Sequence, residues 1–496
     1  MTNRLCGPLV AILWLATLPA EAAESRHNIV LFLIDDLGWR DLGCQGSVYY
    51  QTPHIDRLAS EGVRFTDAYA ACAVCSPTRA AVLTGKYPAR LSLTNWLPDG
   101  RWNPQAKLRE GRFLRGLPVE EFTLAEALRA TGYRTASIGK WHLGSEPFSL
   151  PEHHGFDVNV AGNAHGAPGS YFFPYQGNWL IPTTELRAKW NVLPDGKEGE
   201  YLTDRLTDEA VKFIRGTQAA KNQEPGTKNS AQPFFLYFPH YGVHTPLQAK
   251  PEVAAKYDRI PETERQGKPE YAAMVESIDD SVGRVLATLR ELELEDNTVI
   301  IFTSDNGGFY NATSNAPLRA NKGAYYEGGI RVPLIIKWPG VTKTGLVVND
   351  PVTSTDLYPT CLAVAGLSAL PNQHVDGVNL RPVLTAAGSL PDRALFWHFP
   401  HYNDHPSSVP SSVIRKGPWK LIETFDPRGI ELYNLANDLS ETSNLIATES
   451  VKVEELRREL DAWRQAVGAE MMQPNPDWDP SVVPDTKKKS KKRSKE

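Results

Sequence analysis

The 496 residues contain little of two features that would assign a protein to a class at once, namely long hydrophobic runs and an excess of basic charge. After residue 18 there is no hydrophobic run long enough to cross a membrane, so a membrane-embedded architecture is not expected. The 53 basic residues are outnumbered by 58 acidic ones, and the net charge of −5 offers no general attraction to nucleic acid. The composition, 41% hydrophobic and 22% charged, is that of a folded globular protein. The length predicts one large α/β domain with a second part, or two domains.

The first residues have the pattern of an export signal. Arg4 precedes an apolar run over residues 5–18, and Ala20 and Ala22 place small residues where a signal peptidase cuts. We therefore expect a signal peptide over residues 1–23 and an exported protein, either periplasmic or secreted. A retained anchor is the lesser alternative, because the run is short for a spanning helix. After cleavage no membrane span is expected.

Cysteine is scarce, at 5 residues. Cys6 would be lost with the signal peptide and is not placed like a lipoprotein cysteine at a cleavage site. Four remain, and if Cys75 is modified, as argued below, at most one pair can form among the other three. These three are Cys44, Cys72 and Cys361, and the sequence does not say which two of them would pair.

One stretch, residues 73–85, organises the rest of the chain. A loop containing Cys75 opens into a small, apolar run of helical character, with Pro77 suited to the first helical turn. Cys75 would then lie at the positive end of a helix dipole, beside the permanent charge of Arg79. The arrangement predicts a site for an oxyanion and for a low-pKa thiol or a derivative of it.

Polar side chains follow two strands that are predicted to be buried. Residues 28–34 are continuously apolar and end in Asp35 and Asp36, and residues 297–304 end in Asp305 and Asn306. Ligands of open α/β sheets bind at the carboxyl ends of strands, and adjacent buried carboxylates need a compensating cation. Four oxygen donors favour Ca²⁺ or Mg²⁺ over zinc. The alternative for Asp35 and Asp36 is a turn exposed to water.

Several of these segments resemble the type I, formylglycine-dependent sulfatases, of the arylsulfatase and N-acetylgalactosamine-sulfatase kind. Cys75-x-Pro77-x-Arg79, followed by Thr84-Gly85, matches the first family motif, with Thr78 where serine is more common. Residues 132–142, G-Y-R-T-A-S-I-G-K-W-H, match the second. Asp305 and Asn306 match the family's distal metal pair, and residues 318–333 resemble the segment that carries a second active-site lysine.

The resemblance implies that Cys75 is converted to formylglycine by a formylglycine-generating enzyme and that the hydrated aldehyde is the nucleophile. His244 is preferred to His240 as the histidine after the strand at residues 233–238. Arg319 and Arg331 are interpreted as scaffold charges. The implied catalytic residues are Cys75, Arg79, Lys140, His142, His244 and Lys322, and the implied ligands of Ca²⁺ or Mg²⁺ are Asp35, Asp36, Cys75, Asp305 and Asn306.

The implied fold is alkaline-phosphatase-like: a large, mixed, mostly parallel sheet between helices, with a smaller C-terminal α+β part. We expect the catalytic domain over residues 24–390, a subdomain with a small antiparallel sheet and a helix over residues 391–475, and a disordered basic tail over residues 476–496. The lysine-rich end of the tail, residues 487–495, could instead bind an anionic surface.

The predicted reaction is removal of sulfate from a sulfated carbohydrate or an aryl sulfate. The expected pocket walls are the long loops of residues 152–201 and the segment 396–405, with His398, His401 and His405 as substrate contacts or surface residues. Three alternatives stay open: a phosphomonoester, phosphodiester or phosphonate hydrolase of the same superfamily, a thiol-dependent hydrolase using unmodified Cys75, and a non-catalytic binder of sulfated glycans.

Overall fold

The computed structural model describes residues 26–98, 104–180, 187–190, 192–219, 232–371, 373 and 375–481. The predicted signal peptide, including Cys6, lies outside the described residues, and so does the tail from residue 482 onward. In the described part of the chain, no helix combines the length and the apolar character that crossing a membrane requires.

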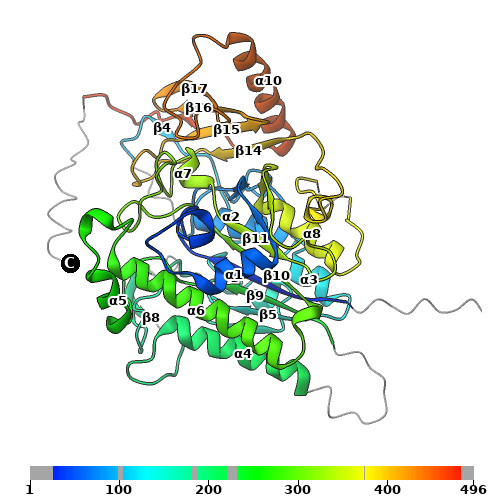
Figure 1. The fold of residues 1–496 in the computed structure, drawn as a ribbon. Helices are drawn as coiled ribbons and strands as arrows, with labels where there is room; N and C mark the ends of the chain where they lie inside the picture. Colours follow the sequence, from blue (N-terminus) through cyan, green and yellow to red (C-terminus); the bar gives the residue numbers. More distant parts are fainter. Residues whose placement is uncertain are drawn as a thin grey trace, which may run out of the picture.

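An eight-stranded sheet forms the centre of the molecule, with strand order β12-β2-β11-β10-β1-β9-β5-β6 (Figure 1). Seven strands run in one direction, and β11 pairs antiparallel with both of its neighbours. The strands are β1 (Asn28–Ile34), β2 (Val63–Phe65), β5 (Arg134–Ile138), β6 (Val158–Val160), β9 (Phe234–Pro239), β10 (Thr298–Ser304), β11 (Leu334–Lys337) and β12 (Leu346–Val348).

The central strand β1 is buried on both faces, as its unbroken apolar sequence predicts. Alternate residues enter two different cores: Val30, Phe32 and Ile34 pack on one face of the sheet, and Ile29, Leu31 and Leu33 on the other. The first face is covered by α1 (Pro53–Glu61), α4 (Leu202–Ala219), α5 (Pro251–Asp258) and α6 (Pro269–Glu291); the second by α2 (Cys75–Thr84), α3 (Leu124–Arg129), α8 (Leu357–Val364) and α9 (Arg381–Leu384).

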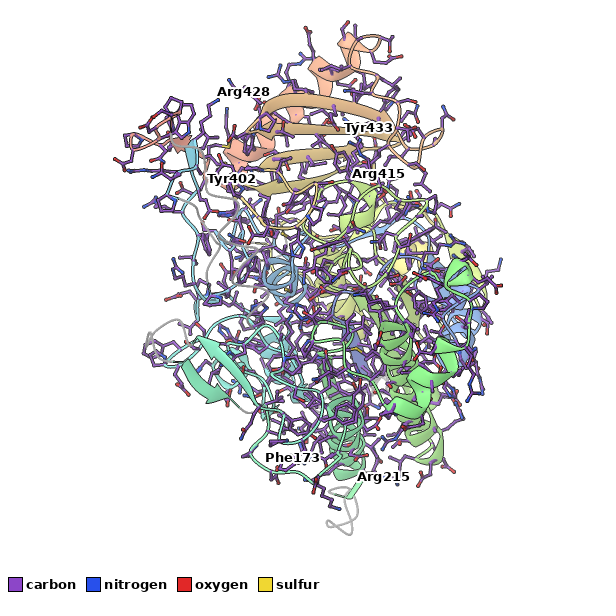
Figure 2. All side chains as sticks on the ribbon, turned by 90° about the vertical axis from the view of Figure 1, so that its left-hand side faces the viewer. Phe173, Arg215, Tyr402, Arg415, Arg428 and Tyr433 are labelled. Atoms are coloured by element: carbon purple, nitrogen blue, oxygen red, sulfur yellow. The ribbon has the colours of Figure 1, made fainter. Side chains whose placement is uncertain are left out.

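The C-terminal part forms a separate antiparallel sheet at one end of the molecule (Figure 1). Its strands are β14 (Ala394–Phe399), β15 (Ser411–Lys416), β16 (Trp419–Phe425) and β17 (Arg428–Asn434), and α10 (Ser450–Val467) packs on it. In Figure 2, Tyr402 and Arg415 lie where this sheet meets the main body, whereas Phe173 and Arg215 lie at the opposite end. Apart from short 3-10 helices, the described part of the chain also contains α7 (Glu327–Ile330) and three strand pairs: β3 (Ala68–Tyr69) with β13 (Val352–Thr353), β4 (Leu108–Arg109) with β18 (Gln473–Pro474), and β7 (Gly177–Leu180) with β8 (Arg187–Trp190).

The predicted α/β class is confirmed, including the mostly parallel sheet between helices and the separate antiparallel sheet. One local expectation is wrong. Residues 152–201 are not loop throughout, because β6 lies among them as the eighth strand of the main sheet.

Candidate active site

Four neighbouring parallel strands deliver side chains to one edge of the main sheet. Their order is β10-β1-β9-β5, and the carboxyl ends of parallel strands meet at the same edge. The segments after these strands carry all but three of the predicted site residues. Asp305 and Asn306 follow β10, Asp35 and Asp36 follow β1, His244 follows β9, and Lys140 and His142 follow β5.

Asp35 lies at the centre of the group and is fully buried. One of its oxygens, Oδ2, pairs with Lys140 Nζ and lies 3.7 Å from Arg79 Nη2. Arg79 also binds Asp305, with 2.9 Å between Nε and Oδ2 and 2.8 Å between Nη2 and Oδ2. Burial and the neighbouring Asp305 raise the pKa of Asp35 to about 8, although Lys140 and Arg79 oppose the rise.

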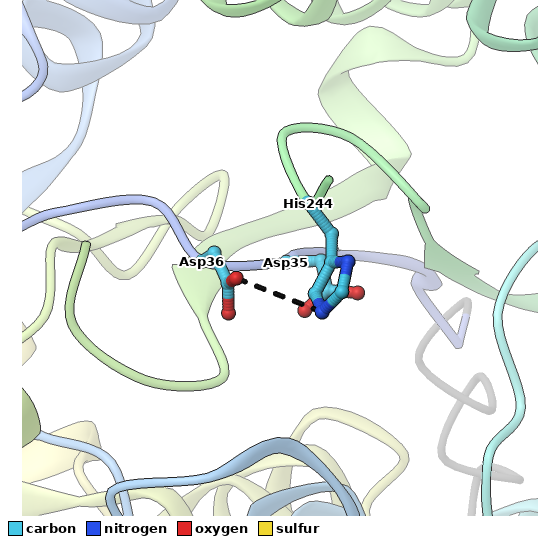
Figure 3. Close-up of side chains that lie close together, drawn as sticks. All are labelled: Asp35, Asp36 and His244. Carbon is cyan, nitrogen blue, oxygen red and sulfur yellow. Dashed lines mark ion pairs between the residues drawn. The ribbon is translucent and has the colours of Figure 1, made fainter. Parts of the chain in front are cut away.

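Asp36 faces a different set of partners. Lys322 Nζ lies 2.6 Å from Asp36 Oδ1, and Asn306 Nδ2 donates to the same oxygen at 2.8 Å. His244 Nε2 lies 3.8 Å from Asp36 Oδ2; Figure 3 shows this pair beside Asp35, with the histidine coming from a separate loop. Burial alone would raise the pKa of Asp36, but Lys322 and His244 hold it well below its ordinary value.

Cys75 is the first residue of α2, whose residues are all buried, and Val74 is the N-cap. The prediction of a low-pKa thiol is wrong: burial raises the pKa of Cys75, although Lys140 and Lys322 oppose the rise. The Cys75 Sγ, one oxygen of Asp35 and one of Asp305 all lie within 4.8 Å of one another. The helix terminus therefore places residue 75 against carboxylates as well as cations.

A pocket of about 320 Å³ opens directly above these groups. Asp36, Cys75, His142, His244 and Lys322 line it. The other predicted site residues are not among its lining residues and lie buried behind its floor: Asp35, Arg79, Lys140, Asp305 and Asn306.

The two predicted site histidines that line the pocket, His142 and His244, are neutral. Burial, reinforced by Lys140, holds the pKa of His142 well below its ordinary value, and burial with Lys322 lowers the pKa of His244 to about 3. His142 Nε2 contacts the carbonyl oxygen of Leu97, which can only accept a hydrogen bond, so Nε2 carries the proton. The unprotonated Nδ1 has no hydrogen-bond partner among the described residues. The same argument puts the His244 proton on Nδ1, which lies 2.8 Å from the Thr245 carbonyl oxygen.

Both stretches expected to form pocket walls contribute lining residues. Residues 164–167 come from the first, and Tyr402, Asn403, Asp404 and His405 from the second. His398 and His401 are neither substrate contacts nor surface residues: His398 lies 2.7 Å from Ser412 Oγ, and His401 lies 2.8 Å from Thr94 Oγ1, both buried.

Three aromatic residues of the pocket were not predicted from the sequence: Trp96, Phe309 and Tyr310. Tyr310 is 43% exposed, which is unusual for a large aromatic side chain. Its position directly after Asp305-Asn306-Gly307-Gly308 and Phe309 was the signal available in the sequence, because loops that follow site residues form pocket rims.

Four cysteines, Cys44, Cys72, Cys75 and Cys361, lie within the described residues, and all four carry free thiols. Cys72, three residues before Cys75, is buried, and its Sγ lies 3.0 Å from the Tyr325 hydroxyl. None of the pairings left open by the sequence is formed.

The residues behind the pocket floor suit a hard divalent cation. Asp35 Oδ1 and Asn306 Oδ1 are buried and have no hydrogen-bond partner among the described residues, which is costly for acceptors without a ligand. The carboxylates of Asp36 and Asp305 complete an oxygen-rich set beside residue 75. His240, by contrast, is buried 3.3 Å from Ser281 Oγ, away from the pocket.

An oxygen-rich set that suits a cation, beside a helix-terminal side chain and beneath a pocket lined by a lysine and by His142 and His244, is the arrangement expected of a hydrolase acting on esters of an inorganic acid. Comparison with known proteins identifies the family. The family model described as Sulfatase matches residues 27–367, and one described as N-sulphoglucosamine sulphohydrolase, C-terminal, matches residues 320–466. The chain belongs to the sulfatase family and is a sulfuric ester hydrolase.

Three relatives illustrate the match. A protein named Sulfatase from Formosa agariphila is 34% identical over 89% of this chain and 88% of its own. The N-acetylgalactosamine-6-sulfatase of Canis lupus familiaris is 35% identical over 79% and 72%. The solved structure of Ps i-CgsB in complex with k-i-k-neocarrahexaose has a TM-score of 0.73 and 31% identity, and the match covers 95% of this chain and 97% of that one.

Proposed function

We propose that this protein is an exported sulfatase that removes sulfate from a sulfated carbohydrate, with formylglycine at position 75 and a bound Ca²⁺ or Mg²⁺. The observation that carries the proposal is the position of Cys75. It lines the pocket, and its Sγ is grouped with oxygens of Asp35 and Asp305. Two buried acceptors of the same site, Asp35 Oδ1 and Asn306 Oδ1, have no hydrogen-bond partner in the part of the chain that the structure describes. Asp35, Asp36, Asp305, Asn306 and residue 75 would hold the cation.

A sulfate ester brings negative charge into the pocket, so its binding needs fixed positive charge and hydrogen-bond donors. Burial alone would lower the pKa of Lys322, but Asp36 holds it above its ordinary value, so the lysine stays cationic at the pocket wall. Lys140 and Arg79 lie behind the floor and offset the charge of Asp35 and Asp305. A bound divalent cation would add positive charge for orienting the ester and residue 75.

The formylglycine hydrate would supply one hydroxyl to attack sulfur and a second through which sulfate is later eliminated; neither serine nor unmodified cysteine offers the second step. For that elimination a proton acceptor is needed. His142 fits because its unprotonated Nδ1 is buried at the pocket without another hydrogen-bond partner among the described residues. Of the two candidate donors to the leaving alcohol, Lys322 fits because it stays cationic beside Asp36, whereas His244 is neutral and holds its proton on Nδ1 towards the Thr245 carbonyl oxygen.

The preference for a carbohydrate is supported by two relatives, one named for N-acetylgalactosamine 6-sulfate and one solved with a neocarrahexaose. The aromatic side chains of Trp96, Tyr310 and Tyr402 also suit a sugar ring, whose faces are apolar. An aryl sulfate remains the alternative substrate. Export is supported by the apolar run of residues 5–18 after Arg4.

The decisive experiment is mass spectrometry of the tryptic peptide containing residue 75, from protein produced with a formylglycine-generating enzyme. We expect a mass below that of the cysteine peptide by the difference between a thiol and an aldehyde, and sulfate release from at least one member of a panel of sulfated galactose and galactosamine saccharides. An active protein in which residue 75 remains wholly cysteine would overturn the formylglycine mechanism in favour of a thiol-dependent hydrolase. The raised pKa of Cys75 argues against that outcome.

A further inference from the structure

The four-residue helix α7 is a junction between segments that carry site residues. The segment leading to Cys75 is tied to it by Ala70 N, which donates to Ile330 O at 2.8 Å. The segment after Asn306 is tied by Gly307 N, which donates to Gly329 O at 3.0 Å. The segment carrying Lys322 is tied by Gly328 N, which donates to Arg319 O at 2.8 Å. Any displacement of α7 would therefore move three parts of the site.

The packing around α7 leaves no space for this helix to shift. A Cβ on Gly329 would lie 1.9 Å from Ala324 O, and one on Gly307 would lie 1.9 Å from Gly328 O. Backbone meets backbone at these points, so no flexible side chain can move aside to absorb a shift. The position of α7 is transmitted directly to its neighbours.

The C-terminal subdomain holds α7 through its first residue, Glu327, which is fully buried. Lys420 Nζ, from β16, lies 2.8 Å from Glu327 Oε1 and 2.8 Å from Glu441 Oε1. Glu441 in turn accepts from the backbone N–H of Glu327, at 2.7 Å from Oε2. Lys420 and Glu441 are also fully buried, so this link is not weakened by water.

Around this link lies a larger group, which we name the subdomain charge cluster. It draws on both parts of the molecule: Arg331 Nη1 donates to Glu327 Oε2 at 3.1 Å, and Arg415, from β15, lies 2.6 Å from Asp67 Oδ2, just before β3. The cluster has three acidic and three basic members: Asp67, Glu327, Arg331, Arg415, Lys420 and Glu441.

We propose that Lys420 is a positioning residue for catalysis: by holding Glu327 together with Glu441, it fixes α7 and, through α7, the placement of Lys322, residue 75 and Asn306. The proposal rests on the site residues assigned under the proposed function. Lys420 itself is not among the residues lining the pocket, so any effect on turnover must pass through the fold.

The test is a double-mutant cycle on full-length, formylglycine-containing protein at pH 8, where Glu441 is charged. Lys420→Met leaves two carboxylates without their shared cation, and we expect kcat on the best substrate of the panel to fall about tenfold per folded molecule. Lys420→Met/Glu441→Gln removes one carboxylate as well, and we expect kcat to recover to within about threefold of the wild type. If Lys420→Met does not fold, Glu441→Gln alone is expected to lower kcat about two- to threefold.

The matched control is Lys416→Met on the adjacent strand β15. Lys416 pairs with Glu459 at 2.8 Å, but it is one-third exposed and belongs to a pair away from α7, so kcat and KM should not change. The proposal is overturned if Lys420→Met lowers the melting temperature while kcat and KM per folded molecule stay at wild-type values, if the double variant is as slow as the single one, or if Glu441→Gln is as active as the wild type. Cys75→Ala is measured alongside: if it stays active, the assigned site is wrong, whatever Lys420 does.

Discussion

The protein contains two charge clusters that have equal numbers of acidic and basic residues but differ in character. The active-site charge cluster has three acids and three bases, and so does the subdomain charge cluster. In the first, Asp35 Oδ1 and the neighbouring Asn306 Oδ1 lack partners among the described residues, and a pocket lies above. In the second, every carboxylate oxygen faces a cationic side chain or a backbone N–H group. The members of the active-site cluster are Asp35, Asp36, Arg79, Lys140, Asp305 and Lys322.

The comparison teaches that buried charge by itself does not mark a catalytic centre. A cluster is closed when its charges balance and each of its oxygens has a partner, and such a cluster fixes the arrangement of the parts of the molecule that it joins. With acceptors left over and space beside them, it is prepared for a ligand. The pairing of each oxygen is therefore more informative than the count of charges.

The largest effect should come from removing the cation that we propose binds at the active-site charge cluster. We expect a strong chelator to lower sulfatase activity at least about 100-fold, with recovery on adding Ca²⁺ or Mg²⁺. Since a ligand present at 100 times its Kd stabilises the folded state by about 2.7 kcal/mol, the melting temperature should also fall by a few degrees. Elemental analysis confirms that the metal has left.

Asn306→Ala is the matching variant, because it removes one of the two unpartnered acceptors. It should reduce the rise in melting temperature that Ca²⁺ produces, whereas Lys416→Met, in an ion pair outside both clusters, should not. If the metal-free protein keeps both its activity and its melting temperature, the active-site charge cluster does not bind a functional cation, and the proposed difference between the two clusters is wrong.

A smaller effect is expected from pH on the closed cluster. Burial raises the pKa of Glu441 to about 7, although Lys420 opposes the rise. The folded state therefore binds more protons than the unfolded state between about pH 4.5 and pH 7, and the Glu441 contribution to stability falls as pH rises through that window. Its size is on the order of 1 to 3 kcal/mol.

Differential scanning calorimetry of the wild type and Glu441→Gln from pH 5 to pH 8 checks this. The wild type should lose stability relative to the variant as pH increases, since only the wild type must ionise a buried carboxyl group. A constant difference between the two curves would show that Glu441 does not titrate in this range.

The smallest effect concerns the pocket that only the active-site cluster borders. Tyr310→Ala should raise KM for a sulfated oligosaccharide about five- to tenfold, roughly 1 to 1.4 kcal/mol of lost aromatic contact, with little change in kcat. Tyr310→Phe keeps the ring and serves as the control. Equal KM values for Tyr310→Ala and the wild type would mean that the exposed ring does not contact substrate.

Much of the main sheet and of the site edge could be predicted from sequence. The apolar run of β1 is long and unbroken, and its carboxyl end is followed by Asp35 and Asp36, so both the strand and the position of its polar residues were readable. The long amphipathic helix α6 can be recognised by a different feature, the stripe of apolar residues along one of its faces. β6 was not, because three residues give too little periodicity to separate a strand from a loop.

The sequence predicted which residues form the site, but not which of them line the pocket and which lie buried behind it. Family motifs pointed to Lys140 and His142 alike, yet only His142 lines the pocket, whereas Lys140 pairs with Asp35 behind it. The pKa of Cys75 was predicted in the wrong direction, because a helix terminus can be read from sequence and the degree of burial beside two carboxylates cannot. The link from Lys420 to Glu327 spans 93 positions, and no local pattern announces such a contact.

The reversed direction of β11 has a consequence for how this enzyme can vary. Since β11 runs against β10 and pairs with it, the chain leaves the sheet after Ser304 and returns at Leu334 along the same edge. The two ends of the segment between β10 and β11 are thus held together by neighbouring strands. The entropy of closing such a segment depends only weakly on the number of residues in it. Insertions at its exposed parts, such as Tyr310, are compatible with an unchanged sheet. Pocket shape can therefore diversify between β10 and β11 while the strands that supply the acidic residues stay fixed.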